Sequence, residues 1–152
     1  MANSEAFSQI LNQVESLQKN IAKEVAPEIN KLFKESVAHS LVDYYNSYDP
    51  FWYTRTNNFI GVYKSAKTTA NGNIVTMSVS DEYMHDYPGF WGKPLYSSAA
   101  LDFFFKNGEH GHGKWMVKQS LPPAMYVERD IEDGFGDRIQ KIINDKVKKL
   151  LK

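Results

Sequence analysis

Residues 4–25 read SEAFSQILNQVESLQKNIAKEV, and the spacing of their apolar side chains decides which fold the chain adopts. These side chains recur at steps of three and four residues, the period of an amphipathic α-helix; they are Phe7, Ile10, Leu11, Val14, Leu17, Ile21 and Val25. Asn3 or Ser4 suits the start of the helix, because a short polar side chain accepts a hydrogen bond from the free N–H groups there. The N-terminal region is therefore predicted to be a long helix.

The helical pattern continues beyond Pro27. Residues 28–45 repeat it with Ile29, Leu32, Phe33, Val37, Leu41, Val42 and Tyr45. Proline lacks the N–H group and clashes with the preceding turn, so we expect a bend or a break at Pro27. The region is predicted to be one bent helix or two joined helices. Asp49-Pro50 stops it, because the residue before a proline avoids helical geometry.

Turn signals predict a hairpin in the middle of the chain. Asn71-Gly72 is a strong short-range hairpin signal. Apolar and polar residues alternate from Val75 to Ser80, as they do in a half-buried strand. We expect an antiparallel hairpin of residues 57–67 with 73–83.

Further elements follow the hairpin. Residues 84–98 form a loop rich in proline and glycine. A short helix is expected near 98–107, with Ser97 or Ser98 as its N-cap and Gly108 just after its end. The segment KWMVKQS, residues 114–120, is a plausible third strand, which Pro122-Pro123 ends.

The predicted fold class is α+β. An antiparallel sheet of about three to four strands packs against the long N-terminal helix, bent or broken at Pro27, and against a C-terminal helix over 124–152. Gly134 and Gly136 weaken the beginning of that helix, so its solid part runs from Asp137. The chain is expected to be a single domain, 1–152, because its length suits one hydrophobic core. Its parts are a helical N-terminal arm (1–45), a sheet region (57–120) and the C-terminal helix.

Composition limits the classes of partner. Lysine plus arginine equals 18 and aspartate plus glutamate equals 18, so the formal net charge is zero and nothing global favours nucleic acid. The absence of cysteine excludes disulfides and thiolate metal sites. No apolar run approaches the roughly 20 residues that span a bilayer, and the N-terminal sequence lacks the pattern of a secretory signal. We expect no cofactor, no membrane contact and no sequence-specific nucleic-acid partner.

The stretch YYNSYDPFWYTRTNNF, residues 44–59, holds seven aromatic side chains. Such rings can form a core, a subunit interface or a platform for a ligand. Arg55 is the only lysine or arginine between Lys34 and Lys64, which argues against base stacking in a basic groove. Arg55 either pins the turn, by bonding local carbonyls or Asp49, or faces a partner chain. The interface hypothesis uses residues of the loops 46–56 and 84–98, namely Tyr48, Phe51, Trp52, Tyr53, Arg55, Phe90 and Trp91.

Candidate metal ligands form a separate group. His85, Glu109, His110 and His112 offer the imidazoles and carboxylate that zinc prefers. The zincin motif His-Glu-x-x-His is absent, and so are Gly-x-Ser-x-Gly and a cysteine nucleophile. The sequence therefore predicts no enzyme. The alternative is a small metal- or ligand-binding α+β domain that uses the histidine-containing loops, with hydrolysis as its candidate activity.

The segment SLVDYYNSYDPFWYTRTNNF, residues 40–59, resembles the Tyr-x-x-Tyr-x-Pro-x-x-Tyr-x-Arg segment of tail-completion, or head–tail joining, proteins of long-tailed bacteriophages. The best matches are Tyr45, Tyr48, Pro50, Tyr53 and Arg55, with looser ones at Asn107, Gly108, His110 and Gly111. The order of elements is also similar over residues 36–150: a helix, the aromatic turn, a hairpin, a short helix, a glycine-rich loop and a C-terminal helix.

This resemblance implies a structural role. Such proteins are α+β subunits that form rings between the portal–connector complex and the tail tube, and they are not enzymes. The resemblance thus implies a homo-oligomeric ring in the neck or tail of a virion, contacting connector and tail-tube proteins, and assembled in the host cytoplasm. Two departures, a longer N-terminal helix over residues 1–35 and a loop 84–98 richer in aromatics, leave a tail terminator or a minor capsid component open.

Overall fold

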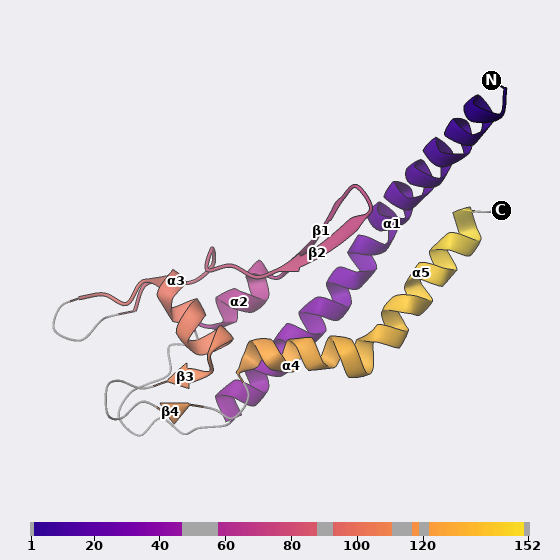
Figure 1. Ribbon diagram of the computed structural model, residues 1–152. Helices are drawn as coiled ribbons and strands as arrows, with labels where there is room; N and C mark the ends of the chain where they lie inside the picture. Colours follow the sequence, from indigo (N-terminus) through magenta and orange to yellow (C-terminus); the bar gives the residue numbers. More distant parts are fainter. Residues whose placement is uncertain (1, 47–57, 88–92, 111–116, 119–121, 151–152) are drawn as a thin grey trace.

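The computed structural model describes residues 2–46, 58–87, 93–110, 117–118 and 122–150, with side chains for 7–46, 58–87, 93–108 and 122–150. One helix, α1 (Ala2–Asn46), runs the length of the molecule (Figure 1). Its 45 residues span about 68 Å at 1.5 Å per residue. Its buried apolar side chains follow the predicted steps of three and four: Ala22, Val25, Ile29, Leu32, Phe33, Val37, Leu41 and Tyr44. The predicted long helix is confirmed.

Pro27 does not break α1, so the predicted alternative of two joined helices is wrong. Pro27 itself is exposed. Lys146 of the C-terminal helix pairs with Glu24 and Glu28, which lie on either side of the proline. Tertiary contacts on both sides therefore hold the helix together where its own hydrogen-bond ladder lacks an N–H group.

The hairpin is built from β1 (Lys67–Asn71) and β2 (Ile74–Ser78), paired antiparallel with Asn71 opposite Ile74. Gly72 has a φ of 61°, the left-handed conformation that a tight two-residue turn requires. The predicted hairpin is confirmed in outline, but its turn residues are Gly72 and Asn73, one residue later than the predicted Asn71-Gly72, and its second strand ends at Ser78.

The predicted first strand is wrong over most of its length, because residues 60–65 form the helix α2 (Ile60–Ser65). Phe59, Val62 and Ala66 are buried, and their spacing of three and four turns them toward the same side. All three belong to the core cluster that includes Phe33 and Val37 of α1. Burial against α1 thus overrides the β-branched and aromatic residues that favoured a strand.

A sheet of three to four strands is not found among the described residues; the strands form two separate two-stranded sheets. β3 (Glu109–His110) pairs with β4 (Val117–Lys118), where Glu109 lies opposite Lys118. The predicted third strand thus pairs with the histidine-containing segment and not with the hairpin. The fold is mainly helical, with small antiparallel sheets against a long helix.

The short helix predicted near 98–107 consists of α3 (Ser97–Ala100) and a π-helical continuation, η2 (Leu101–Lys106). Gly108 follows with a φ of 66°, in agreement with its predicted place after the helix end. The predicted serine cap is wrong. Tyr96 is the N-cap, and the Ser97 N–H donates to Asp86 Oδ1 at 2.8 Å, so a carboxylate from the preceding loop satisfies it.

The C-terminal region is a continuous helical run of α4 (Pro123–Arg129), the π-helical η4 (Asp130–Phe135) and α5 (Gly136–Leu150). It agrees with the predicted helix over 124–152. α4 crosses α1, the chain turns near η4, and α5 then runs back along α1 toward the N-terminus (Figure 1). The N-terminal half of α1 is therefore flanked by α5 on one side and by the hairpin on the other.

The core lies under the C-terminal half of α1. Tyr44 and Phe59, the two ends of the aromatic stretch, are buried there with ring centroids 5.4 Å apart. Phe59 also contacts Phe104 and Phe105 of η2, at centroid distances of 5.7 and 6.3 Å. Part of the aromatic stretch therefore serves the core, as one of the predicted alternatives proposes.

Candidate interaction surface

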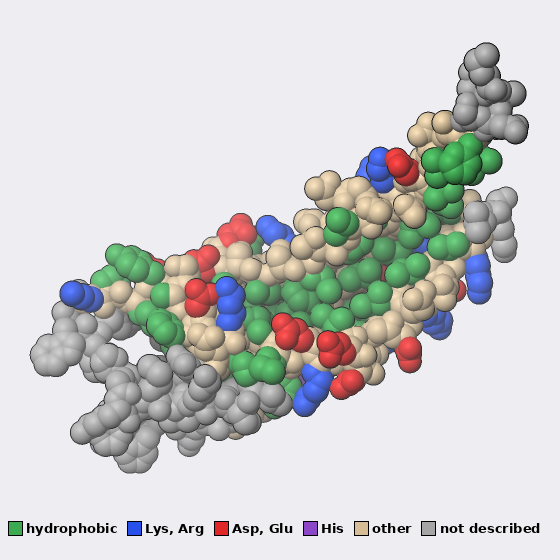
Figure 2. Space-filling model, viewed as in Figure 1, with side chains coloured by type: hydrophobic (Ala, Val, Ile, Leu, Met, Phe, Trp, Pro, Cys, Tyr) green, Lys and Arg blue, Asp and Glu red, His purple; other side chains and the backbone are tan. Residues whose placement is uncertain are grey.

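An apolar groove runs along α1 where the hairpin and α5 flank it. It is lined by Gln18, Ile21, Ala22 and Val25 of α1, Asn73 and Val75 of the hairpin, and Ile143 of α5, and its volume is about 240 Å³. Figure 2 shows hydrophobic side chains gathered in a band along α1 between the hairpin and α5. The apolar face of α1 that forms the core thus continues toward the N-terminus, where it lines this groove.

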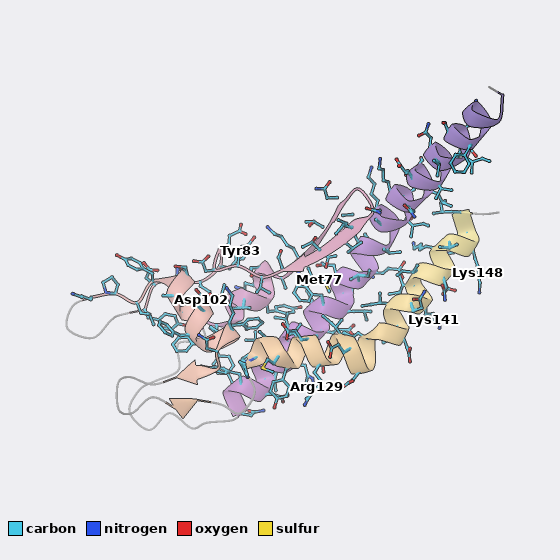
Figure 3. All side chains as sticks on the ribbon, in the orientation of Figure 1. Met77, Tyr83, Asp102, Arg129, Lys141 and Lys148 are labelled. Atoms are coloured by element: carbon cyan, nitrogen blue, oxygen red, sulfur yellow. The ribbon has the colours of Figure 1, made fainter. Side chains whose placement is uncertain are left out.

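Ion pairs set the position of α5 on α1. Lys146 Nζ lies 3.1 Å from Glu28 Oε1 and 3.6 Å from Glu24 Oε2. One end of α5 is tied further down α1, where Arg138 Nη2 donates to Glu35 Oε2 at 3.2 Å. Lys141 and Lys148 lie on the side of α5 away from α1 (Figure 3). Because α5 is antiparallel to α1 and ends at Leu150, it flanks α1 only to about the level of the groove.

The first turns of α1 extend past both flanking elements (Figure 1). We call residues 2–17 the projecting turns. Their large apolar side chains are exposed: Phe7 is 62% exposed, Ile10 57%, Leu11 48% and Val14 46%. These four residues are named the stripe. Steps of three and four continue from the stripe to Leu17 and Ile21, so the stripe and the groove form one continuous apolar face.

Electrostatics at the groove favour the observed packing of α5. The hydrogen bond that Lys146 donates to Glu28, and then the attraction of Glu28 and Glu24, hold the pKa of Lys146 above its ordinary value of 10.5. A cation with a raised pKa stabilises the folded state fully below its ordinary pKa, and that contribution is lost as the pH rises through the raised value. The α1–α5 contact is thus supported by charge throughout the neutral range.

Lys146→Gln is therefore expected to lower the melting temperature by a constant amount between about pH 7 and pH 10, and by a shrinking amount above about pH 10.5. The measurement is thermal unfolding of wild type and variant, followed by circular dichroism at each pH. Lys141→Gln is the control, because Lys141 lies on the opposite side of α5 (Figure 3). A difference that persists unchanged at the most alkaline pH would contradict the assignment.

The residues of the interface hypothesis lie outside the described residues. These are Tyr48, Phe51, Trp52, Tyr53, Arg55, Phe90 and Trp91. The elements that flank their segments, the C-terminal end of α1 and the start of α3, lie at the end of the molecule opposite the projecting turns (Figure 1). The interface hypothesis therefore stays a prediction.

The four predicted metal ligands are not brought together within the described residues. His85 lies in the loop between β2 and α3, where its N–H donates to Asn58 Oδ1 at 2.8 Å. Glu109 and His110 form β3, and His112 lies outside the described residues. No group of three histidine, aspartate or glutamate side chains that could hold a metal occurs in the part of the chain that the structure describes.

The projecting stripe was not recognised as a surface from sequence, where its residues counted as one face of an amphipathic helix. A signal was present in the element lengths. α1 has 45 residues and α5 has 15, so at about 1.5 Å per residue the second helix covers only a third of the first. When the apolar pattern of one helix is longer than the elements that can pack on it, part of that apolar face is expected to be exposed.

The fold defines a class of mainly helical protein, built on one long helix whose apolar face extends beyond the core. The chain belongs to the YomN family, whose model matches residues 6–152. The match begins just before Phe7 and so includes the stripe and the groove. No curated protein and no solved structure matches the chain. Among the described residues, no helix is both long and apolar enough to cross a membrane.

Proposed function

We propose that this protein is a structural subunit of a phage or prophage virion, a tail-completion or head–tail joining adaptor that works as a homo-oligomer between connector and tail. The observation that carries the proposal is the stripe of α1, which the described part of its own chain leaves exposed. A surface of this kind marks a protein–protein contact, because soluble monomers rarely expose contiguous apolar patches.

Covering the four stripe residues favours association. Fully burying one large apolar side chain contributes about 1.5–3 kcal/mol, so covering four half-exposed ones favours association by roughly 4 kcal/mol per subunit before entropic costs. A protein that functioned alone would carry this surface as a liability for aggregation.

The second support is the resemblance of residues 36–150 to tail-completion proteins. Its best-matched residues, Tyr45 to Arg55, begin in the last turn of α1, and those after Asn46 lie outside the described residues. Exposed aromatic side chains, Tyr83 at 52% and Tyr96 at 62%, occur in the loops before α3. Exposed apolar surface on the stripe and in these separate loops suits an adaptor, which must contact different neighbours at once.

The test mixes the purified protein with the connector and tail-tube proteins encoded in the same genome and measures mass by light scattering coupled to size-exclusion chromatography. We expect a complex that contains several copies of this chain, seen as a ring by electron microscopy. The protein eluting as a monomer both alone and in that mixture would overturn the proposal. Portal, capsid and tail-tube genes beside the gene for this chain are expected as well.

A further inference from the structure

We propose that α1 pairs with α1 of a second copy of this chain, antiparallel and around a two-fold axis at Val14, so that the stripe of each copy covers the groove of the other. The inference goes beyond the proposed function and does not depend on it, since it concerns one symmetric contact at the N-terminal end. Its starting point is that the stripe and the groove lie on one face of one helix.

No described element of the same subunit covers the stripe. The stripe and the groove belong to successive turns of α1, which is continuous from Ala2 to Asn46. The stripe cannot fold back onto its own groove without breaking that helix. The neighbouring helix α5 ends at Leu150, and the first turns of α1 extend past its end (Figure 1). The described part of the chain thus leaves the stripe available to another molecule.

The spacing of the apolar residues is self-complementary in the antiparallel direction. With Val14 opposite its own copy, Leu11 faces Leu17 and Phe7 faces Ile21. Ile10 then faces Gln18, at the edge of the groove. The residues 7–21 of each copy form a contact about 21 Å long, along a seam of three- and four-residue steps typical of paired helices. Phe7 of each copy would enter the groove of the other, which is lined by Ile21, Ala22 and Val25.

Charge favours a second copy over other occupants. Between Phe7 and Ile21 the charged residues are Glu15 and Lys19, of opposite sign, and the remaining polar residues are serines and amides. Pairing of two copies therefore concentrates no charge of one sign, and antiparallel helices oppose their dipoles favourably. A nucleic acid or an anionic lipid surface would need several cations beside the stripe, and this segment offers Lys19 alone.

The symmetry of the contact is closed. An isologous contact joins two copies and no more, because the same patch is used on both sides. The stripe thus produces dimers, and any ring must use other surfaces, such as the opposite end of the molecule. If the chain forms no dimer, the adaptor role is not contradicted. If the chain forms a dimer that binds no connector or tail protein, the pairing of the two α1 helices is not contradicted.

The first test is the mass of the full chain in solution. Light scattering is expected to give twice the 17.4 kDa of one chain at a concentration of about 100 μM, with dissociation on dilution. Val14→Glu places two carboxylates together at the axis and is expected to leave only monomer. Asn12→Glu, on the opposite side of α1, is expected to leave the dimer intact, and circular dichroism should show the same helix content in both variants.

The second test determines the direction of pairing by disulfide cross-linking. Because the chain has no native cysteine, only the introduced cysteines can form disulfides. Under oxidation, Val14→Cys is expected to form a disulfide-linked dimer by itself. Phe7→Cys is expected to cross-link to Ile21→Cys in a mixture and not to itself. Wild type that remains monomeric at about 100 μM would overturn the pairing and leave the stripe to a different protein. Efficient self-linking of Phe7→Cys would overturn the antiparallel register.

Discussion

Phe59→Ala is expected to lower the free energy of unfolding by about 3–5 kcal/mol, the usual cost of removing a buried ring and leaving a cavity. Phe59 is 2% exposed and precedes α2. Its ring contacts Tyr44 of α1 and both Phe104 and Phe105 of η2, so it joins three elements that are distant in sequence. Because total stabilities are about 5–15 kcal/mol, this one change removes a large share.

Urea unfolding followed by circular dichroism at a fixed protein concentration measures the effect. The midpoint should fall while the slope of the transition stays the same, which indicates a loss of stability without a change in the surface exposed on unfolding. Tyr96→Ala is the control, because it removes a ring of similar size that is 62% exposed, and it should change stability by no more than about 0.5 kcal/mol. Equal effects of the two substitutions would show that the core is not centred on Phe59.

Gly61→Ala is expected to destabilise the protein by about 3 kcal/mol, at the upper end of the usual cost of overpacking. A Cβ at this position would lie 2.5 Å from the carbonyl oxygen and 2.7 Å from the carbonyl carbon of Tyr83. These are backbone atoms, which cannot rotate away as the end of a side chain can. The loop that carries them is held to Asn58 by two hydrogen bonds, from Asn58 Nδ2 to the carbonyl oxygen of His85 at 2.5 Å and from the His85 N–H to Asn58 Oδ1 at 2.8 Å.

Gly134→Ala is the matched control for Gly61→Ala. A Cβ at Gly134 has no neighbouring atom within 4 Å, and the residue lies in the helical segment η4. Alanine should therefore leave stability unchanged or raise it by up to about 1 kcal/mol, through its better helix propensity. Thermal unfolding of both variants distinguishes the two positions. A Gly61→Ala variant as stable as the Gly134→Ala variant would mean that the loop does not pack on α2 as described.

Local signals predicted the elements whose form depends on neighbours in the sequence. The helical period from Phe7 to Tyr45 predicted α1, and Asn71-Gly72 predicted the hairpin turn. Gly108 was correctly placed after the end of η2. In each case the decisive interaction lies within a few residues: an apolar period, or a glycine in the left-handed conformation.

Long-range contacts decided the elements that sequence reasoning missed. Residues 59–65 favour a strand by composition, yet residues 60–65 form the helix α2. The reason is that Phe59, Val62 and Ala66 are buried together in the core beside α1. Pro27 indicated a break, yet α1 continues through it, with Val25 and Ile29 buried on both sides and Lys146 paired with Glu24 and Glu28. Neither partner is visible to a reading that considers one segment at a time.

The amino-acid sequence by itself determined that this protein has a long amphipathic helix, a tight hairpin turn and a helical C-terminal region, because backbone conformation follows mainly from local spacing and turn residues. Only the tertiary structure decided which part of the long apolar face is core and which part is surface. The reason is one of length and direction. The chain folds back along α1 as far as Leu150 and the hairpin tip, so the same pattern is buried at Val37 and exposed at Phe7.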